Sequence, residues 1–277
     1  MEWWHAIVFG VIEGVTEFLP ISSTGHLTIM AKIFGYRIDD PSVTAFTAII
    51  QVGAVLATVL YLRKDIWRVG LAWLRGLTDE KRRKRDYKFG WAVLIGSIPI
   101  GIVGLLFKDE IEGVLRSLWF VASALILWSG VMWFADRKAT QNRHEENTTW
   151  KDTLIIGITQ CLALIPGVSR SGATMSAGLL RGFDRVTVTR LSFFLSIPAL
   201  MAAAVLQTVT QYDEIQQGVG WGATLLATLV SFVVAYVAVS WLLKFIARND
   251  YSIFIWYRVG LGVLLIALLS TGTISAV

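Results

Sequence analysis

The sequence has few of the features that mark soluble or secreted proteins. Only 16% of its 277 residues are charged, whereas about a quarter are charged in a typical soluble domain. Its single cysteine, Cys161, excludes an internal disulfide. It also lacks the GxxxxGK(S/T) loop of nucleotide-binding proteins, the HExxH pattern and Cys/His zinc spacings. Classes of protein that depend on these features are therefore excluded.

The sequence is instead rich in apolar residues, since 55% of its residues are hydrophobic. A helix needs about 20 consecutive apolar residues to cross the hydrocarbon core of a bilayer. Uniform runs near that length predict six transmembrane helices: 45–62, 88–107, 115–135, 186–210, 219–246 and 253–273. They recur without a long polar linker, so we expect an all-α integral membrane protein with a single membrane domain, 1–277.

Two further apolar stretches, 3–35 and 152–182, are broken in the middle by Pro, Gly and Ser. Neither half of either stretch is long enough to cross a membrane alone. Irregular backbone at membrane depth is tolerated only where protein or a wet cavity surrounds it. Each stretch is therefore predicted to be a re-entrant helical hairpin.

The two broken stretches also resemble each other. With an offset of 147, GVIEGVTEFLPISSTG (Gly10–Gly25) aligns with GITQCLALIPGVSRSG (Gly157–Gly172). An odd number of predicted crossings separates the copies, so they would form an inverted-topology repeat. Repeat 1 would cover about 1–135 with hairpin 3–35, and repeat 2 about 150–277 with hairpin 152–182. Chance is the alternative explanation for so short a match.

The distribution of basic residues predicts the orientation. Arg63–Lys88 holds ten Lys/Arg, and cytoplasmic loops carry an excess of these residues. Alternation from there places 136–151 and 247–252 inside, 108–114 and 211–218 outside, and both termini outside. The same loop bias accounts for the net charge of +5, and no nucleic-acid partner is expected.

Ionisable side chains are rare within the apolar segments, where a charge costs about 2.5–3.5 kcal/mol on insertion scales. Four of the five lie in the two broken stretches, which predicts a functional site there: Glu13, Glu17, His26, Arg170 and Arg258. Arg258 follows Trp256 and Tyr257, so it is expected either to anchor the helix at the interface or to contact a carboxylate.

Glu13 and Glu17 are four residues apart on the first half-helix, so their carboxylates share one face. Two like charges repel, and either one carboxyl is protonated or a cation bridges the pair. Mg²⁺ suits this arrangement because it binds one or two carboxylates together with substrate phosphate oxygens. A solvated helix face is the alternative, which the apolar run Ala6–Leu19 disfavours.

The loops at the two breaks offer groups that bind anions. Pro20–His26 supplies hydroxyls, backbone N–H groups and one imidazole at the start of a helix, where anions are stabilised. A linker with a capping serine is the alternative for this loop. Pro166–Thr174 places Arg170, a planar donor suited to phosphate, among serines and glycines. Ser23 lies three residues before His26, which could remove its proton. This inventory predicts phosphoryl transfer to serine or water on a lipid substrate.

The two loops carry a family resemblance. EGVTEFLPISSTGH (Glu13–His26) and PGVSRSGAT (Pro166–Thr174) resemble the two signature motifs of the bacterial undecaprenyl-diphosphatase family, the bacitracin-resistance type. The match covers essentially the whole chain, including Ile50–Gly53. The resemblance implies hydrolysis of undecaprenyl diphosphate to undecaprenyl phosphate and inorganic phosphate, which recycles the lipid carrier of peptidoglycan and other cell-wall polymers. It also implies a divalent cation, Mg²⁺ or Ca²⁺, and a multi-pass protein of the bacterial plasma membrane whose site opens outward.

The resemblance further implies roles for individual residues. Glu13 and Glu17 would form the acidic motif, Ser23 and His26 the catalytic loop, and Arg170 the diphosphate contact. The substrate cradle would comprise Ser22, Thr24, Gly25, Gly167, Ser169, Ser171, Gly172 and Thr174. Our working hypothesis makes Ser23 the nucleophile and His26 its base, while Glu17, with Glu13, holds the cation or relays a proton. His26 as nucleophile and a metal-activated water remain open.

Two other classes of protein are alternatives to an undecaprenyl-diphosphatase. A lipid or anion transporter or flippase would use the same inverted repeat and broken helices. The membrane phosphatases with a Pro-Ser-Gly-His motif are disfavoured, because their second motif needs a histidine and none follows Arg170. The expected partners are a polyprenyl diphosphate and membrane lipids, with a homodimer as one option for the oligomeric state.

Overall fold

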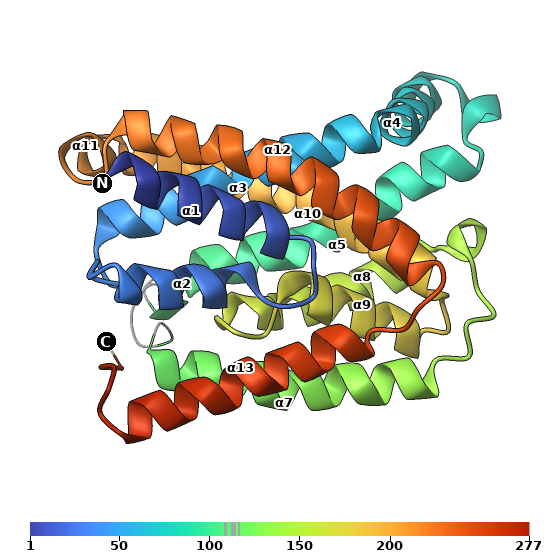
Figure 1. Ribbon diagram of the computed structural model, residues 1–277. Helices are drawn as coiled ribbons and strands as arrows, with labels where there is room; N and C mark the ends of the chain where they lie inside the picture. The colour runs from blue at the N-terminus through green and yellow to red at the C-terminus, as the bar shows by residue number, and fades with distance from the viewer. Residues whose placement is uncertain (108–109, 112–114, 116, 277) are drawn as a thin grey trace.

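The computed structural model describes residues 1–107, 110–111, 115 and 117–276 (Figure 1). Over these residues the chain forms helices, turns and one isolated bridge between Arg143 and Phe183, with no strand. The predicted all-α class is therefore confirmed.

Six helices are long and apolar enough to span a membrane, as predicted: α3 (Pro41–Tyr61), α5 (Arg85–Leu106), α7 (Leu118–Lys138), α10 (Arg185–Thr210), α12 (Trp221–Ile246) and α13 (Ser252–Ser270). At about 1.5 Å per residue each is close to the thickness of the hydrocarbon core. The predicted outer loop 108–114 and the first residues of the predicted helix 115–135 lie partly outside the described residues.

The two broken stretches each form a pair of short helices. α1 (Trp3–Thr16) precedes α2 (Ser23–Ile33), and α8 (Trp150–Gln160) precedes α9 (Arg170–Leu180), with the 3-10 turn η4 (Cys161–Leu164) between α8 and α9. Helices of 11–14 residues are only about 16–21 Å long, too short to cross alone. The helix–loop–helix form matches the prediction, and its re-entrant position in a bilayer stays a prediction.

The two hairpins approach each other from opposite ends of the bundle. The open end of α1 and α2 lies on the left of Figure 1, beside both chain termini, and that of α8 and α9 lies on the right. Each hairpin packs closely on a long helix of the other predicted repeat. A Cβ at Gly10 in α1 would lie 2.5 Å from the Ala227 carbonyl oxygen of α12, and one at Gly157 in α8 would lie 1.9 Å from the Gly96 carbonyl oxygen of α5. This interlocking fits the predicted inverted repeat, whose boundaries remain a prediction.

The basic segment Arg63–Lys88, expected to be a loop, is mostly helical. It forms α4 (Arg63–Thr78) and the short 3-10 turn η1 (Glu80–Arg82) before α5 begins. Its high charge concealed an apolar periodicity, since Trp73 and Gly76 pack on α5 and Val69 is buried. The predicted outer loop 211–218 likewise contains a short helix, α11 (Tyr212–Gln217), and the predicted inner loop 136–151 contains the 3-10 turn η3 (Glu145–Asn147).

Candidate active site

The tips of the two hairpins touch each other in the middle of the protein. The backbone N–H of Gly167 donates to Ser22 Oγ at 3.1 Å. In return, Ser171 Oγ donates to the carbonyl oxygen of Leu19 at 2.9 Å. The structure therefore brings together the two loops that the sequence singled out.

The two loops also share one capping geometry. Ser22 and Ser169 are the N-caps of α2 and α9, with φ of 74° and 76°. Their side chains accept from the backbone N–H of Gly25 at 3.3 Å and of Gly172 at 3.1 Å. Left-handed φ is uncommon outside glycine and costs of order 1–3 kcal/mol. The matched serine–glycine pairs of the sequence alignment thus have one physical role, which is to start a helix from a sharply turned loop.

A cavity of about 860 Å³ opens beside the tips, within the size range of small-molecule sites. The first hairpin contributes Glu17, Ser22, Ser23 and Thr24 to its wall, and the second contributes Pro166, Ser169 and Arg170. Most of the remaining wall is apolar and comes from α2, α3, α5 and α10. The polar end and the apolar wall together fit an amphiphilic molecule with an anionic head.

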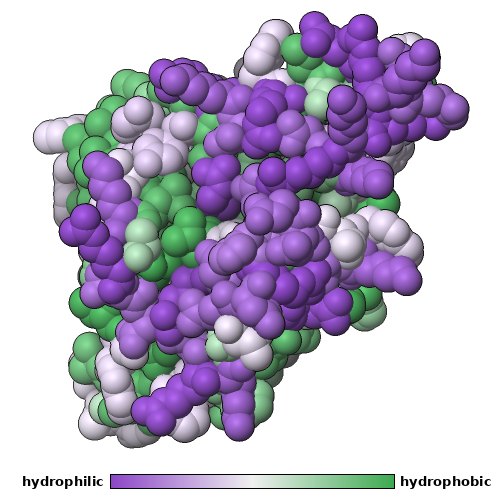
Figure 2. Space-filling view, turned by 90° about the vertical axis from the view of Figure 1, so that its right-hand side faces the viewer, coloured by the Kyte–Doolittle hydropathy of each residue, from purple (hydrophilic) through white to green (hydrophobic). Residues whose placement is uncertain are grey.

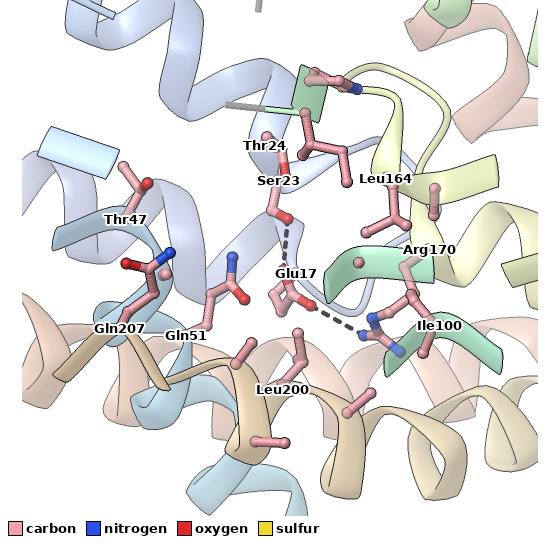
Figure 3. A pocket seen from close by; sticks show the side chains of 18 of the residues that line it. Glu17, Ser23, Thr24, Thr47, Gln51, Ile100, Leu164, Arg170, Leu200 and Gln207 are labelled. Atoms are coloured by element: carbon pink, nitrogen blue, oxygen red, sulfur yellow. Dashed lines mark hydrogen bonds and ion pairs between the residues drawn. The ribbon is translucent and has the colours of Figure 1, made fainter. Parts of the chain in front are cut away.

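Glu17 is the centre of the polar end (Figure 3). Ser23 Oγ donates to Glu17 Oε2 at 2.5 Å, and Arg170 Nη2 donates to Glu17 Oε1 at 2.9 Å. The side chains of Glu17 and Arg170 are only 4% and 9% exposed. A serine hydroxyl bonded to a carboxylate and flanked by a guanidinium is an arrangement that can activate a nucleophile and neutralise an anion.

Arg170 retains a free donor for a ligand. Its Nη1 donates to the Ser192 carbonyl oxygen at 3.3 Å, which together with the Glu17 bond fixes the plane of the guanidinium. Its Nε is buried and has no hydrogen-bond partner among the described residues. Arg170 itself lines the cavity, so its guanidinium places a positive charge beside an anion bound there.

Glu13 lies one turn before Glu17 and is fully buried. Neither of its carboxylate oxygens has a hydrogen-bond partner in the described part of the chain. It is close enough to Glu17 and Arg170 to interact electrostatically with both, but it does not line the cavity. The described residues contain no cluster of three or more His, Cys, Asp or Glu side chains. Among the described residues, the unpartnered oxygens of Glu13 fit a bound cation or proton.

The structure does not bring His26 to Ser23. His26 Nδ1 lies 2.7 Å from the Ser22 carbonyl oxygen, and Nε2 lies 2.7 Å from the hydroxyl of Tyr257. The rings of His26 and Tyr257 are parallel, 5.6 Å apart, and neither residue lines the cavity. The expected Ser23–His26 pair is replaced by Ser23–Glu17, because the imidazole folds back onto the preceding turn.

Arg258 meets neither expectation, since it is completely buried and contacts no carboxylate among the residues that the structure describes. It donates to the carbonyl oxygen of Pro20 at 3.3 Å and to that of Gly167 at 2.8 Å, and so ties the two loops together. Further contacts run to the Ala124 and Leu125 carbonyls and to Ser129 Oγ on α7. Partners more than 90 residues away could not be inferred from its neighbours in the sequence.

The predicted cradle residues divide into two groups. Ser22, Thr24 and Ser169 line the cavity. Five others shape the loops behind it: Gly25, Gly167, Ser171, Gly172 and Thr174. Gln51 is a further site residue that was not predicted from the sequence, and its amide points into the cavity beside Glu17 (Figure 3). A polar residue inside the predicted helix 45–62 was the signal that could have revealed it.

Six long apolar helices and a Ser–Glu–Arg cluster at an apolar cavity define a multi-pass membrane protein with a site for an anionic amphiphile. The family model described as Bacitracin resistance protein BacA matches residues 6–264. The chain belongs to this family.

Curated relatives match along nearly their whole length. Undecaprenyl-diphosphatase 3 of Frankia casuarinae is 68% identical, with 98% of each chain covered. Undecaprenyl-diphosphatase of Cutibacterium acnes is 54% identical over 100% of both chains. Undecaprenyl-diphosphatase 1 of Streptomyces coelicolor is 51% identical, covering 98% of this chain and 97% of its own.

Proposed function

We propose that this chain is an undecaprenyl-diphosphatase, which hydrolyses undecaprenyl diphosphate to undecaprenyl phosphate and inorganic phosphate and so recycles the lipid carrier of cell-wall synthesis. The observation that carries the proposal is Glu17, bonded to Ser23 on one side and Arg170 on the other at the polar end of an apolar cavity. Family membership and the names of the relatives support the same reaction.

The geometry suggests how the residues act. Arg170 binds oxygens of the terminal phosphate and disperses their charge. Ser23 Oγ attacks the terminal phosphorus while Glu17 takes the hydroxyl proton. The bond from that phosphorus to the bridging oxygen breaks, and undecaprenyl phosphate leaves with the electron pair. Water then attacks the phosphoserine, inorganic phosphate departs, and a proton returns to Ser23 Oγ.

His26 acts in this scheme as a positioning residue. A carbonyl oxygen can only accept, so Nδ1 carries the proton toward Ser22, and in the neutral ring Nε2 accepts from the Tyr257 hydroxyl. The ring thereby holds the backbone beside Ser23.

Tyr257→Phe removes one neutral hydrogen bond, worth about 1 kcal/mol. We expect kcat to fall about fivefold with KM nearly unchanged, measured as phosphate release at saturating lipid. The matched control is Tyr236→Phe, which removes a hydroxyl from a ring that packs on Tyr61 instead and should leave kcat unchanged. Equal rates for Tyr257→Phe and wild type would contradict the positioning role.

We also propose that Glu13 and Glu17 would hold a divalent cation, Mg²⁺ or Ca²⁺. The support is the pair of unpartnered Glu13 oxygens next to Glu17. A cation there would supply positive charge to the phosphate.

Chelation with EDTA should therefore lower phosphate release at least about tenfold, and added Mg²⁺ or Ca²⁺ should restore it. Glu13→Gln should raise the cation concentration needed for half-maximal rate, because one of two carboxylate ligands is lost. If EDTA leaves the rate of phosphate release by the wild-type protein unchanged, the cation proposal is contradicted. The proposed attack by Ser23 does not depend on that result.

Location and assembly are proposals too. We place the protein in the bacterial plasma membrane with both termini and the site facing outward. The support is the basic segment Arg63–Lys88, which lies at the opposite end of the bundle from both termini (Figure 1). A homodimer stays a prediction of the resemblance.

Release of phosphate tests the proposed function against the transporter alternative. Purified protein in detergent is incubated with a polyprenyl diphosphate, and free phosphate is measured. Hydrolysis yields phosphate without any membrane to cross, whereas a transporter or flippase yields none. Glu17→Gln, which removes the base but keeps the shape of the side chain, is expected to abolish the release.

A further inference from the structure

Helix α4 differs from the six long helices in direction and in chemistry. Figure 1 shows it nearly end-on at the upper right, while the long helices run across the page. Its axis therefore lies across the bundle, as an interfacial helix lies in the plane of a membrane surface. It begins directly after the apolar helix α3, with only Leu62 between them.

One face of α4 is buried against the protein, and part of it packs on α5. Val69 is 7% exposed. The Trp73 side chain lies against Gly90, where an added Cβ would come within 3.1 Å of it. A Cβ added at Gly76 would lie 2.3 Å from the ring of Tyr87, so this glycine packs directly on that ring. These positions fix which side of the helix faces outward.

The opposite face of α4 is apolar and exposed. Trp67 is 73% exposed and Leu74 is 57% exposed. Because they are seven residues apart, about two helical turns, they project from the same side, away from Val69 and Trp73. Large apolar side chains on a polar end of a protein mark a contact with lipid or another apolar surface.

Cations flank this exposed apolar face. Arg63–Lys88 contains ten Lys/Arg and four Asp/Glu, a net charge of +6. Four of the cations pair with carboxylates: Arg68, Arg82, Arg83 and Arg85. Five exposed ones have no carboxylate or hydrogen-bond partner in the part of the chain that the structure describes: Lys64, Arg75, Lys81, Lys84 and Lys88. Figure 2 faces this end of the molecule and shows a dense hydrophilic cap over its upper part.

We propose that Arg63–Lys88 is a docking surface for anionic phospholipid headgroups, with Trp67 and Leu74 inserted at the base of the acyl chains. Charge complementarity selects the occupant, since unpaired ammonium and guanidinium groups match phosphodiesters. The exposed apolar face and the crosswise axis favour a lipid surface over a soluble protein. This inference does not depend on the reaction that the cavity carries out.

The test uses the whole protein in nanodiscs made of phosphatidylcholine with increasing phosphatidylglycerol, with bound lipid counted by native mass spectrometry. Wild type is expected to prefer phosphatidylglycerol over phosphatidylcholine about tenfold or more. The triple variant Lys64→Gln, Arg75→Gln, Lys84→Gln should lose at least about tenfold of that preference, because each charge near an anionic surface contributes about fivefold. None of these side chains lies in the cavity wall, so phosphate release in detergent should match wild type and report that the variant is folded.

The matched control removes three exposed cations that lie outside the segment: Arg137→Gln, Lys138→Gln and Arg248→Gln. It has the same change in net charge and should reduce the preference less than about threefold. An equal loss in the control would overturn the proposal, because the preference would then reflect total charge. No preference in wild type, as a surface built for a soluble protein partner would give, would overturn it as well.

Discussion

Ser23→Ala is expected to lower kcat for phosphate release by about 1,000-fold or more, because it removes the attacking oxygen of a two-step reaction. The substitution leaves Glu17 paired with Arg170, so binding of the lipid, measured as KM or by inhibition with a non-hydrolysable analogue, should change little. Initial rates of free phosphate release measure the effect.

Ser97→Ala is the matched control for Ser23→Ala. Ser97 also lines the cavity, but its hydroxyl bonds to the backbone carbonyls of Val93 and Leu195 and, within the described part of the chain, to no other side chain. Its loss should change kcat less than about threefold. A Ser23→Ala enzyme that keeps more than about a tenth of the wild-type rate would contradict the serine nucleophile and favour attack by water with Glu17 as its base.

Arg170→Ala is expected to lower kcat/KM by about 100- to 1,000-fold. Two effects combine in this change. The phosphate loses its cationic contact, and the buried carboxylate of Glu17 loses the charge that compensates it.

Two further variants separate these effects. Arg170→Lys keeps the positive charge but not the planar pair of donors that reach Glu17 and Ser192, so it should recover activity only in part. Arg190→Ala is the control, since Arg190 pairs with Asp65 and Glu145 away from the cavity. It should change kcat/KM less than about threefold. Normal activity in Arg170→Ala would contradict the phosphate contact.

The sequence predicts the long helices well because a hydrocarbon core imposes both length and apolar composition on them. All six predicted segments correspond to helices. The break points were also visible, because Pro20 and Pro166 follow apolar segments and precede serine- and glycine-rich turns. The repeat even matched Ser22 with Ser169, which share a left-handed cap.

The side-chain partners at the site could be predicted only in part. Glu17 and Ser23 are close in the chain, yet the direction of each side chain depends on the opposite loop. Arg258 reaches Pro20 across 238 residues, a contact that no local pattern encodes. His26 was expected to act as the base for Ser23 because the two are near in sequence. Its ring instead bonds to the hydroxyl of Tyr257, away from Ser23. The amphipathic face of α4 was hidden because charged residues outnumber apolar ones across the whole segment Arg63–Lys88 in which the helix lies.

The most direct test of the account is the fate of oxygen during hydrolysis of a polyprenyl diphosphate in ¹⁸O-labelled water. Attack at the terminal phosphorus through Ser23 predicts one ¹⁸O atom in the released inorganic phosphate and none in the polyprenyl phosphate, as measured by mass spectrometry of both products. Label in the lipid product, or release of pyrophosphate with a polyprenol, would contradict the account.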